Sequence, residues 1–223
     1  MAFEFDHLFI LTDIGASQAD RLISCGLTEG ASRTHTGQGT ANRSFFFRNA
    51  MLELLWVHDP EEAKSPQIHR TRLWERSTNR QNDACPFGIC LRPTSVSGDT
   101  IAFSSWDYHP PYWPQTISIA VATNSDVLTE PMLFQIPFGK RPDRFPAEKA
   151  QPPEHPIGWR EITRVELVSP MANSVSPELQ AVLDTKQIKL SIGTDYCIQL
   201  GFDGEMQGQQ IDLRPGLPLI LSW

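Results

Sequence analysis

The first quarter of the chain alternates short apolar runs with polar turns. Residues 3–11 and 49–57 are long apolar runs, and their length and polar boundaries predict buried strands. Apolar residues at helical spacing predict a short helix over 19–26, which ends at a glycine. The glycine-containing stretch 33–43 predicts a tight turn or bulge, and another strand follows at 44–48. The resulting order is strand, helix, strand, strand, strand.

The rest of the chain continues this alternation. A polar helix is predicted from about 66 to 77, and the proline-rich stretch 139–156 predicts a crossing over the surface. Beyond it the strand-then-helix order returns, which suggests two similar modules related by pseudo-two-fold symmetry. The remaining predicted elements are strands at 86–91, 116–121, 131–138, 161–168, 188–192, 196–200 and 217–221, and a helix at 176–183.

Each of the two long apolar strands near the N-terminus carries one polar side chain that needs a partner. Glu53 lies in the middle of its strand and His7 in the middle of the other. An ionised carboxylate in an apolar interior costs several kcal/mol unless it is paired, protonated or bound to a metal. We therefore expect one shared site. It is either a divalent metal held by both side chains or a buried hydrogen-bonded pair without an ion.

Aromatic side chains gather in one stretch between two predicted strands. Residues 105–114 hold two Trp, two Tyr and one His among three prolines. Proline excludes a central strand there, and the rings need a surface to cover. The rings either contact a ligand as the wall or lid of a cleft or pack on the body of the protein. The candidate ligand-binding residues are Trp106, Tyr108, His109, Tyr112 and Trp113.

Composition narrows the class of partner. The 223 residues carry a net charge of -7, and the pI near 5.3 disfavours nucleic acid and anionic membranes. No apolar segment approaches the roughly 20 residues of a membrane span. The N-terminus is acidic rather than basic, so we expect a cytoplasmic protein, and the four scattered cysteines are expected to be reduced. A small-molecule ligand is the expected partner.

Several short motifs follow one another in a characteristic order. They are Phe5-Asp6-His7-Leu8, Cys25-Gly26-Leu27, Gly37-Gln38-Gly39-Thr40-Ala41-Asn42, Leu52-Glu53-Leu54-Leu55, Pro86-Phe87-Gly88-Ile89, Ile136-Pro137-Phe138 and His155-Pro156-Ile157-Gly158. Together they resemble the vicinal oxygen chelate superfamily, and specifically its glyoxalase-like branch. This branch includes fold relatives of the bleomycin-resistance and extradiol dioxygenase type.

The resemblance implies a metal site. In the enzymes of this superfamily, the His of the first strand and the Glu of the fourth bind a divalent ion, and the second module supplies equivalents. His7 and Glu53 match those positions, and Gln135 lies in a strand similar to that of Glu53. The implied ion is zinc, iron, manganese or nickel. Glu53 would also act as a catalytic base. The alternative is that the protein binds no metal ion. The further expected ligand-binding residues are Gln38, Thr40, Asn42 and, at the place of His7 in the last module, Arg164.

The fold that this resemblance implies is α+β, with paired modules that form a curved mixed sheet, an open barrel, around a cleft. One domain would cover 1–223, with modules at about 1–58 and 159–223 and connecting strands at 59–158. Two functions remain open. The first is a metal-dependent lyase, isomerase or dioxygenase that acts on a small oxygenated molecule. The second is a non-catalytic protein of the sequestration or resistance type with a degenerate metal site. A homodimer is compatible with either.

Overall fold

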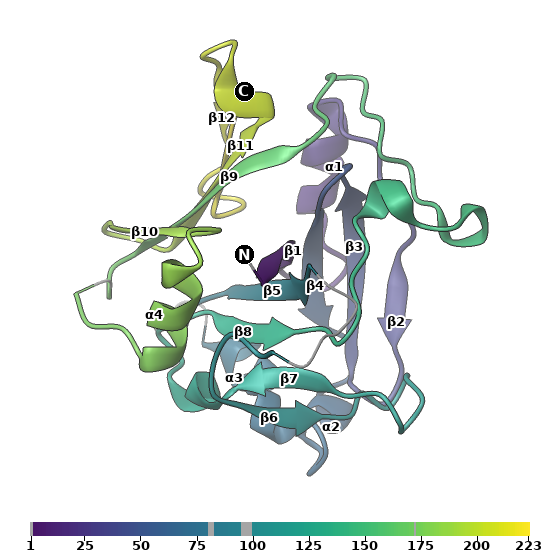
Figure 1. The fold of residues 1–223 in the computed structure, drawn as a ribbon, viewed down its shortest axis with the longest axis vertical. Coiled ribbons are helices and arrows are strands. Elements are labelled where there is room, and N and C mark those ends of the chain that lie inside the picture. The colour runs from purple at the N-terminus through teal and green to yellow at the C-terminus, as the bar shows by residue number, and fades with distance from the viewer. Residues whose placement is uncertain (1, 80–82, 95–99, 172) are drawn as a thin grey trace.

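The computed structural model describes residues 2–79, 83–94, 100–171 and 173–223. They form two mixed β-sheets of eight and five strands with few helices, so the α+β prediction is confirmed (Figure 1). Neither sheet closes on itself as a barrel, and the predicted single curved sheet is two separate sheets. No helix among these residues is both long enough and apolar enough to cross a membrane.

The larger sheet is symmetric in its strand order, β2-β3-β4-β1-β5-β8-β7-β6. β1 and β5 pair antiparallel in the middle, and each pairs parallel with the last strand of its own half. One half of the sheet therefore repeats the other. The strands are β1 (Phe3–Leu11), β2 (Arg33–His35), β3 (Thr40–Phe46), β4 (Met51–Val57), β5 (Phe87–Pro93), β6 (Ser105–Tyr108), β7 (Ile119–Ala122) and β8 (Met132–Gln135).

The smaller sheet has the order β10-β9-β11-β13-β12. Its strands pair only with one another, so the counterpart of β1–β4 in the sheet order is β5–β8 rather than the stretch 159–223. The sequence pattern placed the second module at 159–223 instead, because pairing across a sheet depends on long-range hydrogen bonds that a local pattern does not specify. The strands are β9 (Ile162–Ser169), β10 (Lys189–Ile192), β11 (Cys197–Phe202), β12 (Gln210–Asp212) and β13 (Leu219–Ser222).

The helices are short and lie between strands: α1 (Gln18–Ser24), α2 (Pro60–Lys64), α3 (Leu73–Thr78) and α4 (Pro177–Asp184). The single helix predicted over 66–77 is instead a 3₁₀ turn at His69–Thr71 followed by α3. Arg72 between them has a φ of 58°, which interrupts a continuous helix. α2 begins after Asp59, whose side chain accepts hydrogen bonds from two backbone N–H groups of the first turn.

Two strands of the larger sheet lie where the sequence predicts loops. β2 falls within the predicted turn 33–43, and β6 occupies the start of the aromatic stretch 105–114. Both are edge strands of the larger sheet, and the prolines begin only after β6 ends at Tyr108. An edge strand needs partners on one side only, which is why a weak local pattern suffices for it.

Alternate residues of the central strands face two different environments. Leu8, Leu52 and Leu133 point into the main hydrophobic core, which residues from both sheets share. Phe9 and Phe134 point to the opposite face of the larger sheet, where a second, smaller hydrophobic cluster forms. Side chains alternate across a strand, so His7 and Glu53 also lie on this second face.

Candidate functional site

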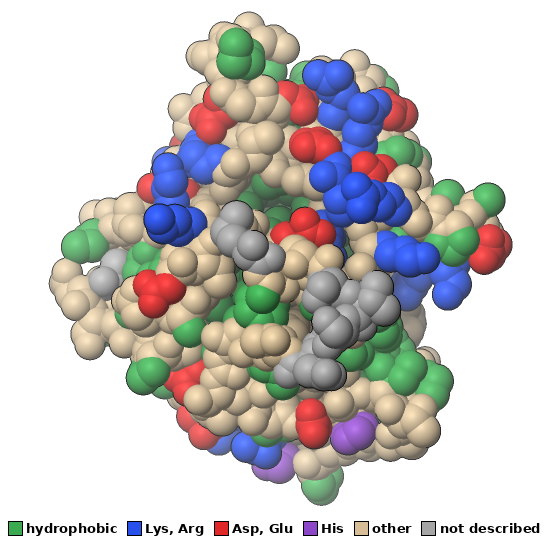
Figure 2. Space-filling view, viewed as in Figure 1, with side chains coloured by type: hydrophobic (Ala, Val, Ile, Leu, Met, Phe, Trp, Pro, Cys, Tyr) green, Lys and Arg blue, Asp and Glu red, His purple; other side chains and the backbone are tan. Residues whose placement is uncertain are grey.

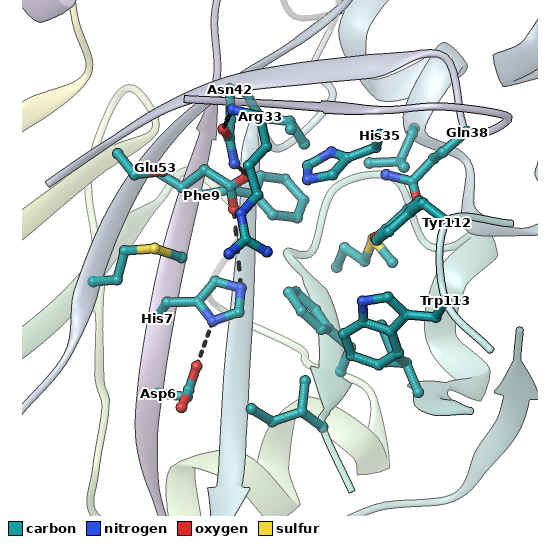
Figure 3. A pocket seen from close by; sticks show the side chains of 18 of the residues that line it. Asp6, His7, Phe9, Arg33, His35, Gln38, Asn42, Glu53, Tyr112 and Trp113 are labelled. Carbon is teal, nitrogen blue, oxygen red and sulfur yellow. Dashed lines mark hydrogen bonds and ion pairs between the residues drawn. The ribbon is translucent and has the colours of Figure 1, made fainter. Parts of the chain in front are cut away.

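A cavity of about 250 Å³ lies on the second face of the larger sheet. Polar side chains from β1 to β4 lie together along one wall, and rings from the stretch after β6 face them (Figure 3). Most of the remaining lining is apolar, as in most small-molecule sites. The apolar lining residues are Phe9, Ala31, Phe46, Met51, Leu55, Leu73, Ile119, Met132, Phe134, Ile136, Phe138 and Phe145.

The structure brings His7 and Glu53 together in this cavity. β1 and β4 are parallel neighbours, and Phe9 lies opposite Glu53, so His7 is two residues away on the same face. The distance from His7 Nε2 to Glu53 Oε2 is 3.9 Å. Asn42 on β3 donates a hydrogen bond to the other oxygen of Glu53, which is only 5% exposed. One ion, one water or one ligand atom could therefore contact both groups.

A chain of charged groups that ends at the buried Arg92 orients the His7 ring. His7 Nδ1 lies 2.6 Å from Asp6 Oδ1, and the other oxygen of Asp6 accepts a hydrogen bond of 3.0 Å from Arg92. Arg92 is 1% exposed and also bonds to Glu4 and to the carbonyl oxygen of Asn49, each at 2.7 Å. This chain leaves His7 Nε2 directed toward Glu53 and the cavity (Figure 3).

Burial by itself lowers the pKa of His7, but Cys90 and Asp6 beside it raise its pKa well above the ordinary value. Burial tends to raise the pKa of Asp6, yet the hydrogen bond and charge of His7, together with Arg92, bring it below the usual value. Burial raises the pKa of the Cys90 thiol, which stays protonated, so Asp6 is the charge that holds the imidazolium. His7 therefore presents an Nε2–H donor to the cavity.

The strand register shows which residue corresponds to His7 in the other half of the sheet. Leu8 and Ile89 lie opposite each other at the centre of the β1–β5 pair. His7 precedes Leu8 as Gly88 precedes Ile89, so Gly88 is its counterpart. A Cβ atom at Gly88 would lie 2.0 Å from Phe9 Cε1, so the ring of Phe9 takes the space of a side chain there.

The same symmetry identifies the counterpart of Glu53. Glu53 lies opposite Phe9, one residue after the centre of β1, and Phe134 lies opposite Cys90, one residue after the centre of β5. Phe134 has no metal-binding atom. Three protein ligands are the usual minimum of a catalytic Zn²⁺ or Fe²⁺ site. Among the described residues, no third His, Cys, Asp or Glu joins His7 and Glu53 in a set whose donor atoms all lie within 4.8 Å of one another, so this pair falls short of such a site.

Asp6, His7 and Cys90 form a second group with metal-capable atoms. One donor atom from each lies within 4.8 Å of the other two, and no other such set of three occurs in the described ranges. The 2.6 Å contact between Asp6 and His7 is a hydrogen bond, and Arg92 holds the second oxygen of Asp6. The thiol is protonated because of its burial. These contacts fit a hydrogen-bonded network better than a metal site.

The structure does not place Gln135 with His7 and Glu53. Gln135 faces the opposite side of β8 from Phe134, which lines the cavity. Its amide donates to the carbonyl oxygen of Thr100 at 3.0 Å and accepts from the backbone N–H of Ala102 at 3.2 Å. The two strands look alike in sequence, but Gln135 is one residue out of step with Glu53, which reverses its direction.

Arg164 also lies outside the cavity. It is on β9, where its guanidinium bonds to Glu205 and Glu166. It lines a separate, charged cavity of about 240 Å³ to which residues from β1, β5 and β9 contribute. Lys and Arg side chains lie beside Asp and Glu side chains on the face drawn in Figure 2. Arg141 in the same lining likewise bonds to carboxylates, so this region is held by ion pairs.

Three of the predicted aromatic residues line the cavity. Tyr108 is 3% exposed, and its hydroxyl donates to Gln38 Oε1 at 2.6 Å. Tyr112 stacks on His35 with ring centroids 4.8 Å apart. Trp113 completes this wall (Figure 3). Tyr108 therefore belongs to the packed cluster, whereas Tyr112 and Trp113 are only half-buried.

Three other predicted ligand-binding residues are not in the lining. Trp106 donates to Ser125 Oγ at 3.3 Å and lies under Arg70. His109 is exposed. Thr40 is fully buried, and its hydroxyl bonds to the side chains of Gln38 and His35, which it holds in place. Thr40 thus supports the site without contacting its interior.

Arg33 and His35 were not predicted as site residues because their stretch was interpreted as a turn. They lie on the short strand β2, two residues apart and hence on the same face, and both line the cavity. Burial lowers the pKa of His35, so this imidazole is neutral at physiological pH. The only sequence pattern that could have indicated Arg33 and His35 was an alternation over three residues. No sequence pattern indicated Asp6 or Arg92, because their roles depend on contacts between strands.

A family model described as a glyoxalase-like domain matches residues 5–183. The chain belongs to this family. The predicted resemblance to glyoxalase-like proteins is therefore confirmed, and β10–β13 lie beyond the matched part of this glyoxalase-like protein. A solved structure of a hypothetical protein from Staphylococcus aureus is similar, with a TM-score of 0.54 and 13% identity over 100% of this chain and 99% of that chain. At that identity the likeness concerns the fold alone. Among curated proteins there is no match.

Proposed function

We propose that this glyoxalase-like protein binds a small, largely apolar molecule in the cavity of the larger sheet. The observation that carries the proposal is the pair of half-buried His7 and buried Glu53, 3.9 Å apart in a cavity with mostly apolar walls. Ligand sites typically combine apolar walls with a few fixed polar groups that set orientation.

The polar pair would contact an oxygenated end of the ligand. His7 offers an N–H donor from a ring that Asp6 orients, and Glu53 offers an acceptor oxygen that faces it. A carbonyl oxygen of the ligand would accept from His7, and a hydroxyl group would donate to Glu53. Both side chains are already fixed by their neighbours, so little side-chain entropy would be lost on binding.

A metal-dependent lyase, isomerase or dioxygenase is the less favoured alternative. The counterparts of His7 and Glu53 in the other half of the sheet are Gly88 and Phe134, which cannot bind an ion. Gln135, the third ligand that the resemblance implied, points away from the cavity with its amide bonded elsewhere. A binding function does not require the missing ligand.

Metal content separates the two functions. Protein purified without a chelator is expected to contain no stoichiometric divalent ion, and zinc, manganese or nickel should leave its melting temperature unchanged. Glu53→Gln should be nearly silent, because an amide oxygen can still accept from Asn42, with a change in unfolding free energy of no more than about 1 to 2 kcal/mol. About one ion per chain, or an ion-dependent rise in melting temperature that Glu53→Gln removes, would restore the metal hypothesis.

Filling the cavity tests the binding proposal directly. Two probes of one shape suit it, neutral 2-naphthalenemethanol and its carboxylate analogue 2-naphthoate, titrated by calorimetry. We expect saturable binding of at least one probe by the wild-type chain and a loss of about tenfold or more in Met51→Trp, whose indole would occupy the cavity. Met206→Trp is the matched control, because Met206 is 87% exposed and outside the lining. Unchanged affinity in Met51→Trp would refute the proposed site.

A further inference from the structure

Three large side chains in the cavity lining carry hydrogen-bond donors that have no hydrogen-bond partner within the described part of the chain. They are the Arg33 guanidinium, the Tyr112 hydroxyl and the Trp113 indole N–H. The Arg33 side chain extends from β2 toward the interior, and Tyr112 and Trp113 lie on the facing wall (Figure 3). A donor that faces a mostly apolar cavity gains a hydrogen bond when the ligand brings an acceptor atom.

Most of the strong acceptors in the same lining are already engaged, and Glu53 Oε2 is the main one left open. Glu53 accepts from Asn42 with one oxygen and faces the His7 ring with the other. Gln38 Oε1 accepts from the Tyr108 hydroxyl at 2.6 Å. The cavity therefore offers an excess of donors. A ligand that matches it is rich in acceptor oxygens.

The charges of the side chains around the cavity also favour a ligand with acceptor oxygens. The other charges near the cavity have partners of opposite sign, because His7 faces Glu53 and Arg92 bonds to both Asp6 and Glu4. Within the described residues, no carboxylate lies within ion-pair distance of the Arg33 guanidinium. One positive charge therefore remains uncompensated at the exposed edge of the cavity, in a chain whose net charge is -7. A single negative charge on the ligand would neutralise it.

From these two observations we infer that the ligand is an apolar monocarboxylic acid, bound as its anion. Its two coplanar oxygens match the planar fork of Arg33, and Tyr112 and Trp113 supply further donors. Phe134 and Phe138 line the space for its body, and the volume of about 250 Å³ suits a body of one or two rings or a short branched chain. The inference rests on the proposed function, because it assigns the ligand class of the same cavity.

The two naphthalene probes test this inference, because they share a shape and differ in charge. For the wild-type chain, 2-naphthoate is expected to bind at least about tenfold more tightly than 2-naphthalenemethanol. Arg33→Gln should remove most of this preference and leave the affinity for the alcohol unchanged. Added salt should weaken only the binding of 2-naphthoate. Arg70→Gln is the charge-matched control, because Arg70 lies over Trp106 outside the cavity.

Each outcome is decisive. Equal affinity for the two probes, or a preference that survives in Arg33→Gln, would overturn the monocarboxylate inference and leave the binding site intact. Failure of both probes to bind the wild-type chain would refute the proposed function as well. Arg33 is exposed, and its side chain makes no hydrogen bond or ion pair with another described residue, so its replacement should leave the fold unchanged, which circular dichroism would verify. Tyr112→Phe, which removes only the hydroxyl, should weaken 2-naphthoate binding and spare the alcohol.

Discussion

Replacing Arg92 with methionine is expected to lower the free energy of unfolding by about 3 to 5 kcal/mol. The Arg92 guanidinium is 1% exposed and bonds to Glu4, Asp6 and the carbonyl oxygen of Asn49. Methionine roughly keeps the length of the side chain but removes the charge. Half-buried Asp6 would then keep His7 as its one ion-pair partner among the described residues. Chemical denaturation of the variant measures the loss.

Two comparisons identify the cause of that loss. In Arg92→Met combined with Asp6→Asn, part of the stability should return, because the uncompensated buried charge is gone. Arg164→Met should lose much less than Arg92→Met, since Arg164 and its carboxylate partners are partly exposed to water. Equal losses for the two arginines, or no recovery in the double variant, would contradict the assignment of Arg92 as the group that stabilises Asp6 and thereby His7.

Tyr108→Ala is also expected to lose about 3 to 5 kcal/mol of unfolding free energy, whereas Trp113→Ala should lose much less. Tyr108 is 3% exposed within the second hydrophobic cluster, and its hydroxyl bonds to Gln38. Trp113 is half-buried at the cavity wall, where water can replace part of its contacts. Its loss should instead appear as weaker binding of 2-naphthoate. Denaturation and calorimetry on each single variant measure the two effects separately.

The control for this comparison is Tyr108→Phe, which keeps the ring and removes only the hydroxyl. It should cost about 1 to 3 kcal/mol, because the buried Gln38 oxygen loses its donor. Similar stability losses for Tyr108→Ala and Trp113→Ala would show that the aromatic stretch behaves as one unit, either as packed core or as a lid. The structure instead divides it between the two roles.

Much of the local structure follows from the sequence. The apolar runs around His7 and Glu53 are strands β1 and β4, and the helical spacing that follows the first run is α1. Their shared site was also foreseeable, because two lone polar groups in apolar strands each need a partner. The family could likewise be inferred, since it depends on the order of short motifs rather than on contacts.

The composition of the cavity was decided by tertiary structure. A shift of one residue reverses the direction of a side chain, so Phe134 rather than Gln135 faces Glu53 across the sheet. The partner of Asp6 is Arg92, 86 residues away in the chain, and Arg33 enters the cavity from an edge strand of three residues.

Hydrophobic alternation is a local property, and the sequence by itself therefore determined the long strands β1 and β4 and the polar groups that they carry. Strand pairing and register depend on hydrogen bonds between segments that are distant in the chain. Those bonds alone placed Gly88 and Phe134 where a second pair of metal ligands would lie.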